Sequence, residues 1–244
     1  MAGSREKAWG KEKQFREGQA VQKLDDLVFV YVETIKKLQP KVALLENVKG
    51  LIQGNAKVYA KEIQKRFTEA GYNVQLFLLN AASMGVPQKR ERVFFIGLRK
   101  DIDLPKLELS FNEKGILFGE ILDKTDIIQT LRNAEKKVWH LVKYGDKTLA
   151  NAYERYQGKA SFFQHNIQYD NEVAYTMTGS GGGQSIIYKY KRHFNTKENI
   201  SSGSYPLDYN FKDIQPKYLI GMSVPPVMTA QISHQIYLQW LSKI

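Results

Sequence analysis

The stretch "KVALLENVKGL" occupies residues 41–51 and decides the fold class of this sequence. An apolar run from Val42 to Leu45 ends directly at a carboxylate and an amide, Glu46 and Asn47. Short continuous apolar runs are typical of buried parallel strands. Open α/β sheets place their ligands outside the carboxyl ends of such strands. We therefore expect a strand at 42–45 and a functional carboxylate at Glu46; the alternative is a plain strand-end carboxylate that caps the next helix.

The segments around this stretch alternate between helical and strand patterns. Apolar residues at helical spacing predict helices over 24–38 and 57–70, and strand patterns cover 72–80 and 93–98. This order is typical of a doubly wound α/β sheet. Three strands are too few for such a sheet, and the segment opens with a helix. We expect an incomplete doubly wound, Rossmann-like sheet whose first half is absent.

The second part of the chain has a different character. Residues 105–190 show weak periodicity, many Tyr, Lys and Asn, and the segment "TGSGGGQS" at 178–185. Residues 226–243 return to helical spacing. The expected domains are the second half of a catalytic domain at 1–105, a small mixed recognition domain at 106–200, and a C-terminal segment at 201–244 that packs back on the first. The last helix carries apolar residues four apart: Met228, Ile232, Ile236 and Trp240.

Composition narrows the classes of function. The chain has 244 residues, of which 43% are hydrophobic and 25% charged, as in globular proteins. The net charge of +11 favours a polyanionic partner, nucleic acid first, with a basic solvated surface as the alternative. No apolar run reaches the roughly 20 residues that span a bilayer. The N-terminus has no signal-peptide core, so we expect a cytoplasmic protein without a membrane partner.

Cysteine and histidine usage excludes several kinds of site. The sequence contains no cysteine, which rules out disulfides, thiolate metal ligands and a cysteine nucleophile within these residues. The four histidines show no metal-ligand spacing, so we expect no metal site.

Three motifs occur together in the chain: "ENV" at 46–48, "PQKRERVFFIG" at 87–97 and "GMSVPPVMTAQIS" at 221–233. In this order they resemble the DNA cytosine-C5 methyltransferases, the modification enzymes of bacterial restriction systems. The segment "NTKENISSGSYPLDYNF" at 195–211 is faintly similar to a further motif of that family. The resemblance covers most of 1–100 and 195–244, and the arginine motif with its flanks is the most specific part.

The resemblance implies a reaction and residues for it. In this family a thiolate adds to C6 of a flipped cytosine, and C5 then attacks the methyl group of S-adenosylmethionine (AdoMet). The implied role of Glu46 is to share a proton with N3, and that of Asn47 is to orient the loop. Arg90 and Arg92 would hold cytosine O2, the flipped phosphate and Glu46. The alternative for "KRER" is a solvated hairpin tip.

Cofactor and DNA contacts are implied in the same way. The residues that match cofactor positions are Leu27, Ser223 and Val224. The residues expected at double-stranded DNA are Gln88, Arg90, Thr178, Gly179, Gly181, Gly182, Gln184 and Ser185, with Thr176 as a further guess. The glycine-rich segment could instead be a linker or a phosphate-binding nest.

The sequence departs from the family pattern in an informative way. The family's glycine-rich AdoMet loop and its Pro-Cys loop are both missing, and "MAGSREK" at 1–7 resembles the segment just after the nucleophile loop. Met222 stands where the family usually has Asn. We expect a chain that acts only with a partner polypeptide carrying the N-terminal motifs, and that is poorly soluble alone because its sheet edge is open. The alternatives are a truncated remnant that methylates nothing and a stand-alone nucleic-acid-binding module.

Overall fold

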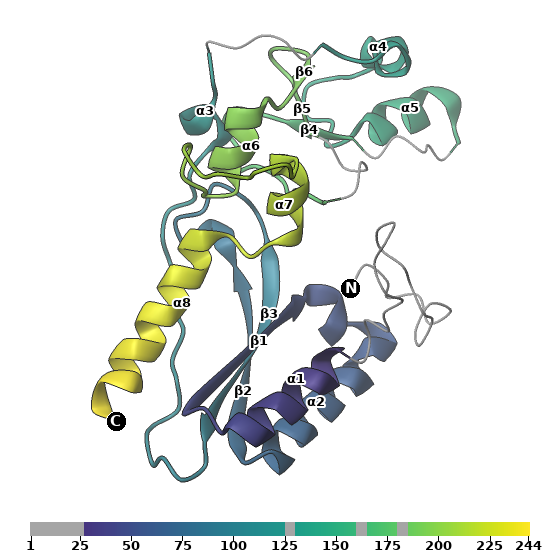
Figure 1. The fold of residues 1–244 in the computed structure, drawn as a ribbon. Coiled ribbons are helices and arrows are strands. Elements are labelled where there is room, and N and C mark those ends of the chain that lie inside the picture. Colours follow the sequence, from purple (N-terminus) through teal and green to yellow (C-terminus); the bar gives the residue numbers. More distant parts are fainter. Residues whose placement is uncertain (1–26, 125–129, 160–164, 180–184) are drawn as a thin grey trace. The chain divides into compact units, whose positions relative to one another are not determined.

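The computed structural model describes residues 27–124, 130–159, 165–179 and 185–244 (Figure 1). These residues form two compact units. Unit 1 comprises 27–79, 91–109 and 235–244, and unit 2 comprises 80–90 and 110–234. The predicted boundaries at 105 and 200 concern functional domains, which compactness does not test, so they stay predictions.

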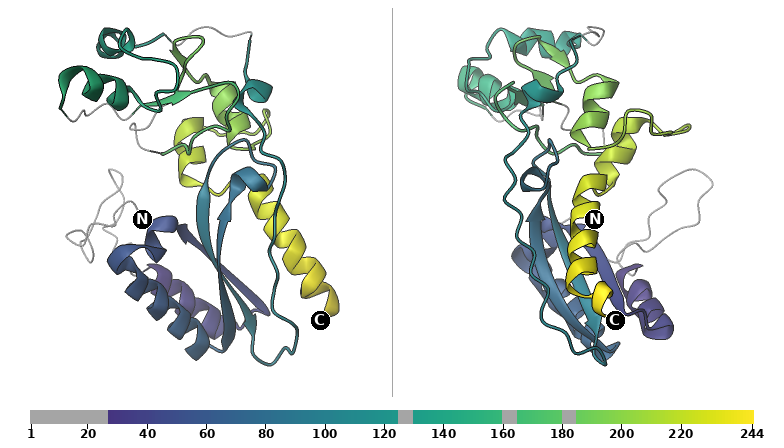
Figure 2. Two further views of the ribbon diagram at one scale, coloured as in Figure 1. Left: turned by 180° about the vertical axis from the view of Figure 1, so that it is seen from behind. Right: turned by 90° about the vertical axis from the view of Figure 1, so that its left-hand side faces the viewer.

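Unit 1 is built on a three-stranded sheet of β1 (Val42–Val48), β2 (Tyr72–Asn80) and β3 (Glu91–Arg99), in the order β1-β3-β2. Two helices, α1 (Leu27–Leu38) and α2 (Lys57–Glu69), lie side by side on one face of this sheet (Figures 1 and 2). Short 3₁₀ turns lie between β1 and α2, at Lys49–Ile52 and Gly54–Ala56, and another follows β2 at Ala81–Ser83. The predicted helices and strands of this region are thus confirmed within the described residues.

The neighbour of β1 differs from the prediction. β1 pairs with β3 in antiparallel register, with Leu45 opposite Phe95, rather than with a parallel strand. Since β3 lies between β1 and β2, β1 is an edge strand among the described residues. Leu44 and Leu45 are only half-buried for the same reason, which corrects the expectation of a buried strand.

Successive side chains along β1 and β3 point alternately to the two faces of the sheet. Ala43, Val93 and Phe95 join the apolar core against α1 and α2, where Phe67 stacks on Phe95 with ring centroids 6.4 Å apart. The other face carries the neighbouring residues of each strand, Glu46 among them. The core therefore fixes which way Glu46 points.

The last helix, α8 (Pro226–Gln239), is shorter than the predicted 226–243 because a 3₁₀ turn at Leu241–Lys243 follows it. Residues 235–244 belong to unit 1, where the indole N–H of Trp240 donates to the Pro105 carbonyl over 2.8 Å. The predicted apolar stripe is confirmed, since its four members are all buried: Met228, Ile232, Ile236 and Trp240.

Unit 2 consists of short elements around a second small sheet. The sheet order is β4 (Asn166–Gln168), β5 (Ser185–Ile187) and β6 (Arg192–His193), and the first pair is parallel while the second is antiparallel. Its helices are α3 (Phe118–Ile121), α4 (Asn133–Trp139), α5 (Leu149–Gln157), α6 (Thr196–Ser202) and α7 (Pro216–Met222).

Unit 2 contains a buried ion pair between Arg192 and Glu198. The two terminal guanidinium nitrogens of Arg192 each donate to a different carboxylate oxygen of Glu198 over 2.8 Å. Glu198 also accepts the backbone N–H of Asn195 over 2.9 Å, and Asn195 caps α6 in return. The carboxylate thereby ties β6 to the start of α6 through charge-assisted hydrogen bonds.

Candidate active site

The carboxylate of Glu46 is held by Arg92 across the β1–β3 ladder. The register places Glu46 opposite Phe94 and Val48 opposite Arg92, so the two charged residues are diagonal neighbours on one face. Arg92 Nε lies 2.9 Å from Glu46 Oε1. The motifs "ENV" and "KRER", which lie more than 40 residues apart in the sequence, therefore meet in one ion pair.

This ion pair is partly screened from water. The side chains of Arg92 and Glu46 are 13% and 30% exposed. Burial lowers the pKa of Arg92, and the charge of Glu46 and its hydrogen bond act in the opposite direction. Arginine keeps its proton under such conditions, so the pair presents a fixed positive charge beside a carboxylate that ligands can still reach.

Asn47 lies on the opposite side of the strand from Glu46 and is 8% exposed. Its Oδ1 accepts the N–H of Val48 over 2.9 Å. The 3₁₀ turn at Lys49–Ile52 follows at once, and Lys49 Nζ lies 2.8 Å from Glu91 Oε2. The orienting role of Asn47 stays a prediction.

Gln88 and Arg90 lie inside unit 2, where they are 0% and 1% exposed. Arg90 donates to the carbonyls of Met177 (2.9 Å), Gly221 (2.9 Å) and Ser223 (2.6 Å). Gln88 donates to the carbonyl of Ser202 over 3.2 Å. The polar atoms that were expected at DNA are thus used to join three segments of unit 2, and their contact with DNA stays a prediction.

The segments that Arg90 joins cross at two glycines. A Cβ added at Gly221 would lie 2.3 Å from Gly179 N and 2.4 Å from Thr178 C. One added at Gly179 would lie 2.8 Å from Met222 Cγ. The backbone at 178–179 therefore passes directly over α7, and only glycine fits at the crossing. Sequence reasoning missed Gly221, although the glycine inside a helical pattern was a signal of close approach.

The predicted cofactor residues fall in both units. In unit 1, Leu27 begins α1 and is 49% exposed. In unit 2, the hydroxyl of Ser223 donates to the Ile220 carbonyl over 3.1 Å, and the Ser223 carbonyl accepts a hydrogen bond from Arg90. Val224 beside it is half-buried.

The predicted DNA residues are only partly described. Thr178 is exposed, Gly179 is half-buried, and Ser185 begins β5 with 9% exposure. The hydroxyl of Thr176 donates to the Lys89 carbonyl. The remaining predicted residues lie outside the described ones: Gly181, Gly182 and Gln184.

The family model for the C-5 cytosine-specific DNA methylases matches residues 8–238, so the chain belongs to that family. The type II methyltransferase M.FnuDI of Fusobacterium nucleatum is 43% identical over 104 residues, which cover 41% of this chain and 30% of the relative. The type II methyltransferase M.NgoFVII of Neisseria gonorrhoeae is 28% identical over 234 residues, covering 84% of this chain and 61% of the relative. The chain thus spans less than two thirds of either relative.

The fold has counterparts among solved methyltransferases. A DNA modification methyltransferase encoded within an E. coli prophage superposes with a TM-score of 0.64 at 16% identity, covering 88% of this chain and 74% of that one. A DNMT2 methyltransferase of Spodoptera frugiperda gives 0.58 at 16% identity, covering 92% and 76%. The chain therefore shares the α/β fold of these enzymes.

Two features are absent from the described residues. They contain no cluster of three or more His, Cys, Asp or Glu side chains arranged to hold a metal ion. None of their helices has the length and apolar character that a bilayer crossing demands.

The glycine crossing predicts the effect of one added methyl group. Gly221→Ala puts a Cβ against backbone atoms of 178–179, so unit 2 should lose about 1–3 kcal/mol of unfolding free energy. This is opposite in sign to the gain of about 1 kcal/mol that alanine brings to an open helix position. Gly50→Ala, whose Cβ would meet nothing closer than 4.0 Å, is the control in urea denaturation. A Gly221→Ala protein as stable as the control would refute the crossing.

Replacing Arg90 by lysine keeps the charge but removes the planar fork. Arg90→Lys should destabilise unit 2 by about 2–4 kcal/mol, because buried carbonyls lose their donors. Hydrogen exchange should rise at the amides of 176–179 and 220–224. Arg66→Lys, at the half-exposed pair with Glu62, should change stability by less than about 0.5 kcal/mol. Equal losses of stability for the two substitutions would count against a structural role for the Arg90 hydrogen bonds.

Proposed function

We propose that this chain supplies the second half of the catalytic domain and the recognition part of a DNA cytosine-C5 methyltransferase of a type II modification system. The observation that carries the proposal is the ion pair of Glu46 and Arg92, which joins two motifs of the family at one end of the β1–β3 ladder. In this proposal the sheet of unit 1 is the second half of a doubly wound methyltransferase sheet.

Glu46 is proposed to share a proton with N3 of the flipped cytosine. Attack at C6 builds negative charge on the ring, and a proton at N3 offsets that charge. Arg92 holds the carboxylate in one orientation, and its guanidinium is proposed to meet cytosine O2. The 30% exposure of Glu46 supports this role because a fully buried carboxylate could not meet the base.

Arg90 and Gln88 are proposed to hold the backbone of unit 2 in place rather than to contact the base. Arg90 holds the carbonyls of Met177, Gly221 and Ser223, and Gln88 holds that of Ser202. Their burial supports this change from the expected direct contact. The fixed backbone at 177–179 leads into the glycine-rich segment, which is proposed to approach DNA.

AdoMet is proposed as the methyl donor, and the described residues fit only a small part of its site. Leu27 in unit 1 is 49% exposed and Val224 in unit 2 is half-buried, whereas Ser223 has its hydroxyl and carbonyl engaged within unit 2. The glycine-rich loop that holds AdoMet in the family is absent from these residues. No step of the reaction is therefore assigned through a cofactor contact of this chain.

The nucleophile is proposed to come from a second polypeptide that carries the Pro-Cys and glycine-rich loops, since these 244 residues contain no cysteine. Among the described residues β1 pairs only with β3, so its other edge can accept a strand. Exposed apolar side chains on α1 support a covering partner: Leu27, Val30 and Leu38 are 49%, 58% and 74% exposed. Without such a partner, the net charge of +11 favours a DNA-binding module that methylates nothing.

The test is reconstitution. This chain and a polypeptide with the missing motifs are mixed with radiolabelled AdoMet and duplex DNA, and incorporation is measured for each chain alone and for both. Transfer should require both chains and should vanish when the partner's cysteine is replaced by serine. If both chains are folded and associated but methyl incorporation does not rise above background, the proposal is refuted. DNA binding without methyl transfer would favour the binding module.

In the reconstituted enzyme, Glu46→Gln should lower the single-turnover rate by about 10²–10⁴-fold, because glutamine cannot share a proton with N3. The unfolding transition should be nearly unchanged, since the amide fills the same space. Glu91→Gln, a half-exposed carboxylate on β3 paired with Lys49, is the control and should keep its rate within about twofold. Equal rates for both variants would remove Glu46 from the chemistry.

A further inference from the structure

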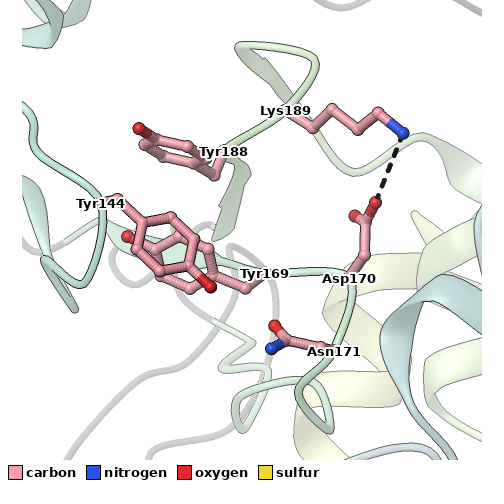
Figure 3. Close-up of a pocket in the computed structure, with 6 residues that line it drawn as sticks. All are labelled: Tyr144, Tyr169, Asp170, Asn171, Tyr188 and Lys189. Atoms are coloured by element: carbon pink, nitrogen blue, oxygen red, sulfur yellow. Dashed lines mark ion pairs between the residues drawn. The ribbon is translucent and has the colours of Figure 1, made fainter.

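Unit 2 contains an aromatic cavity that the proposed reaction does not use. It has a volume of about 290 Å³, near the lower end of pockets for small ligands. Three tyrosines form one side of it, Tyr144, Tyr169 and Tyr188, and Asp170, Asn171 and Lys189 form the other (Figure 3). The cavity thus offers mainly apolar surface to a planar ligand, with polar side chains beside it.

The three rings form an ordered set. Tyr169 and Tyr188 lie with centroids 5.0 Å apart, and Tyr144 meets them edge-on at 5.1 Å and 5.8 Å. Tyr169 is 6% exposed, whereas Tyr144 is 72% exposed. A buried tyrosine in this cluster is explained by the core, but a largely exposed ring beside a cavity is free to cover a ligand.

Hydrogen bonds hold the turn that carries Tyr144 in place before any ligand binds. The hydroxyl of Tyr169 donates to the Asp146 carbonyl over 3.0 Å and accepts the N–H of Gly145 over 2.9 Å. Asp146 in turn binds Arg155 at 2.6 Å. Because these contacts hold the turn, Tyr144 presents its ring at little cost in conformational entropy on binding.

Charge around the cavity distinguishes between ligands for an aromatic site. The turns that carry Tyr144 and Tyr188 also carry four exposed lysines: Lys143, Lys147, Lys189 and Lys191. This excess of positive charge disfavours an ammonium ligand, the other common guest of aromatic cages. It favours a planar ligand attached to phosphate, as in aromatic and basic single-strand sites.

The polar side of the cavity suits the edge of a base. Asp170 Oδ2 lies 4.0 Å from Lys189 Nζ, while Oδ1 is buried and accepts no hydrogen bond from the described residues. Asn171 is exposed and offers both a donor and an acceptor. Because Oδ1 of Asp170 is buried, the exposed amide of Asn171 is the group on this side that can meet the polar groups on a base edge.

We propose that this cavity binds a nucleobase that has left its stack, with the face of the base against the exposed ring of Tyr144 and its edge at Asn171. The base comes either from a single strand or from a duplex opened nearby. This inference rests on the proposed function only in that unit 2 meets DNA. It adds a second base site, separate from the one at Glu46.

The test measures binding of the full chain to a labelled 12-nucleotide single strand and to the matching duplex by fluorescence anisotropy. Tyr144→Ala should weaken binding of one or both by about tenfold, the effect of losing one stacked base. Tyr144→Phe keeps the ring and should bind as the unchanged chain does. Tyr156→Ala removes a tyrosine of α5 that is 67% exposed and serves as the control.

The two DNA arms separate the sources of the base. A loss with the single strand alone indicates an unpaired base, and a loss with the duplex as well indicates a base extruded from it. Equal binding by Tyr144→Ala and Tyr156→Ala would overturn the pocket but leave the methyltransferase proposal standing. If reconstitution fails but DNA binding still falls in Tyr144→Ala, the methyltransferase proposal is overturned and the pocket stands.

A direct readout uses ring signals of ¹³C-labelled tyrosines, assigned through Tyr144→Phe and Tyr188→Phe. Addition of the single strand should shift the signals of Tyr144 and Tyr188 and leave Tyr156 in place. Shifts produced by a trimethyl-lysine peptide but not by DNA would overturn the proposal in favour of an ammonium site.

Discussion

The antiparallel pairing of β1 with β3 is the constraint on which the candidate site depends. It sets Arg92 diagonally across from Glu46, and the alternation of the strands sends both side chains away from α1 and α2. A slip of the register by one residue would turn Glu46 into the apolar core. The packing of Phe95 and Val93 against the helices therefore protects the orientation of the carboxylate as well as the stability of unit 1.

A second constraint operates in unit 2. Arg90 follows the loop after β2 and uses its planar fork on carbonyls from two distant segments, at Met177 and at Gly221 and Ser223. The glycines at 179 and 221 let these segments touch through their backbones. Two arginines two residues apart thus act in different ways: Arg92 orients a carboxylate, and Arg90 joins loops. The buried Arg90 joins backbone segments of unit 2, whereas the pair of Arg92 and Glu46 is partly exposed.

Much of unit 1 was predictable because its signals are local. Apolar periodicity predicts α1, α2 and the three strands, and the motif order predicts that Glu46 and an arginine come together. The antiparallel neighbour of β1 was not predictable, since an apolar run reports burial and not the direction of the next strand. Neither was the division of labour between Arg90 and Arg92, because it depends on carbonyls that lie about 90 to 130 residues away along the chain. The tyrosine cavity was also missed, as its rings come from separate turns with no common spacing.

We propose that Glu46 and Arg92 act as one unit in methyl transfer. A double-substitution cycle in the reconstituted enzyme tests it most directly, with single-turnover rates for Glu46→Gln, Arg92→Gln and the double variant. Groups that act together are non-additive. We predict that the double variant is about as slow as the slower single variant. Losses that simply multiply would show that the two residues act independently, and would contradict the account.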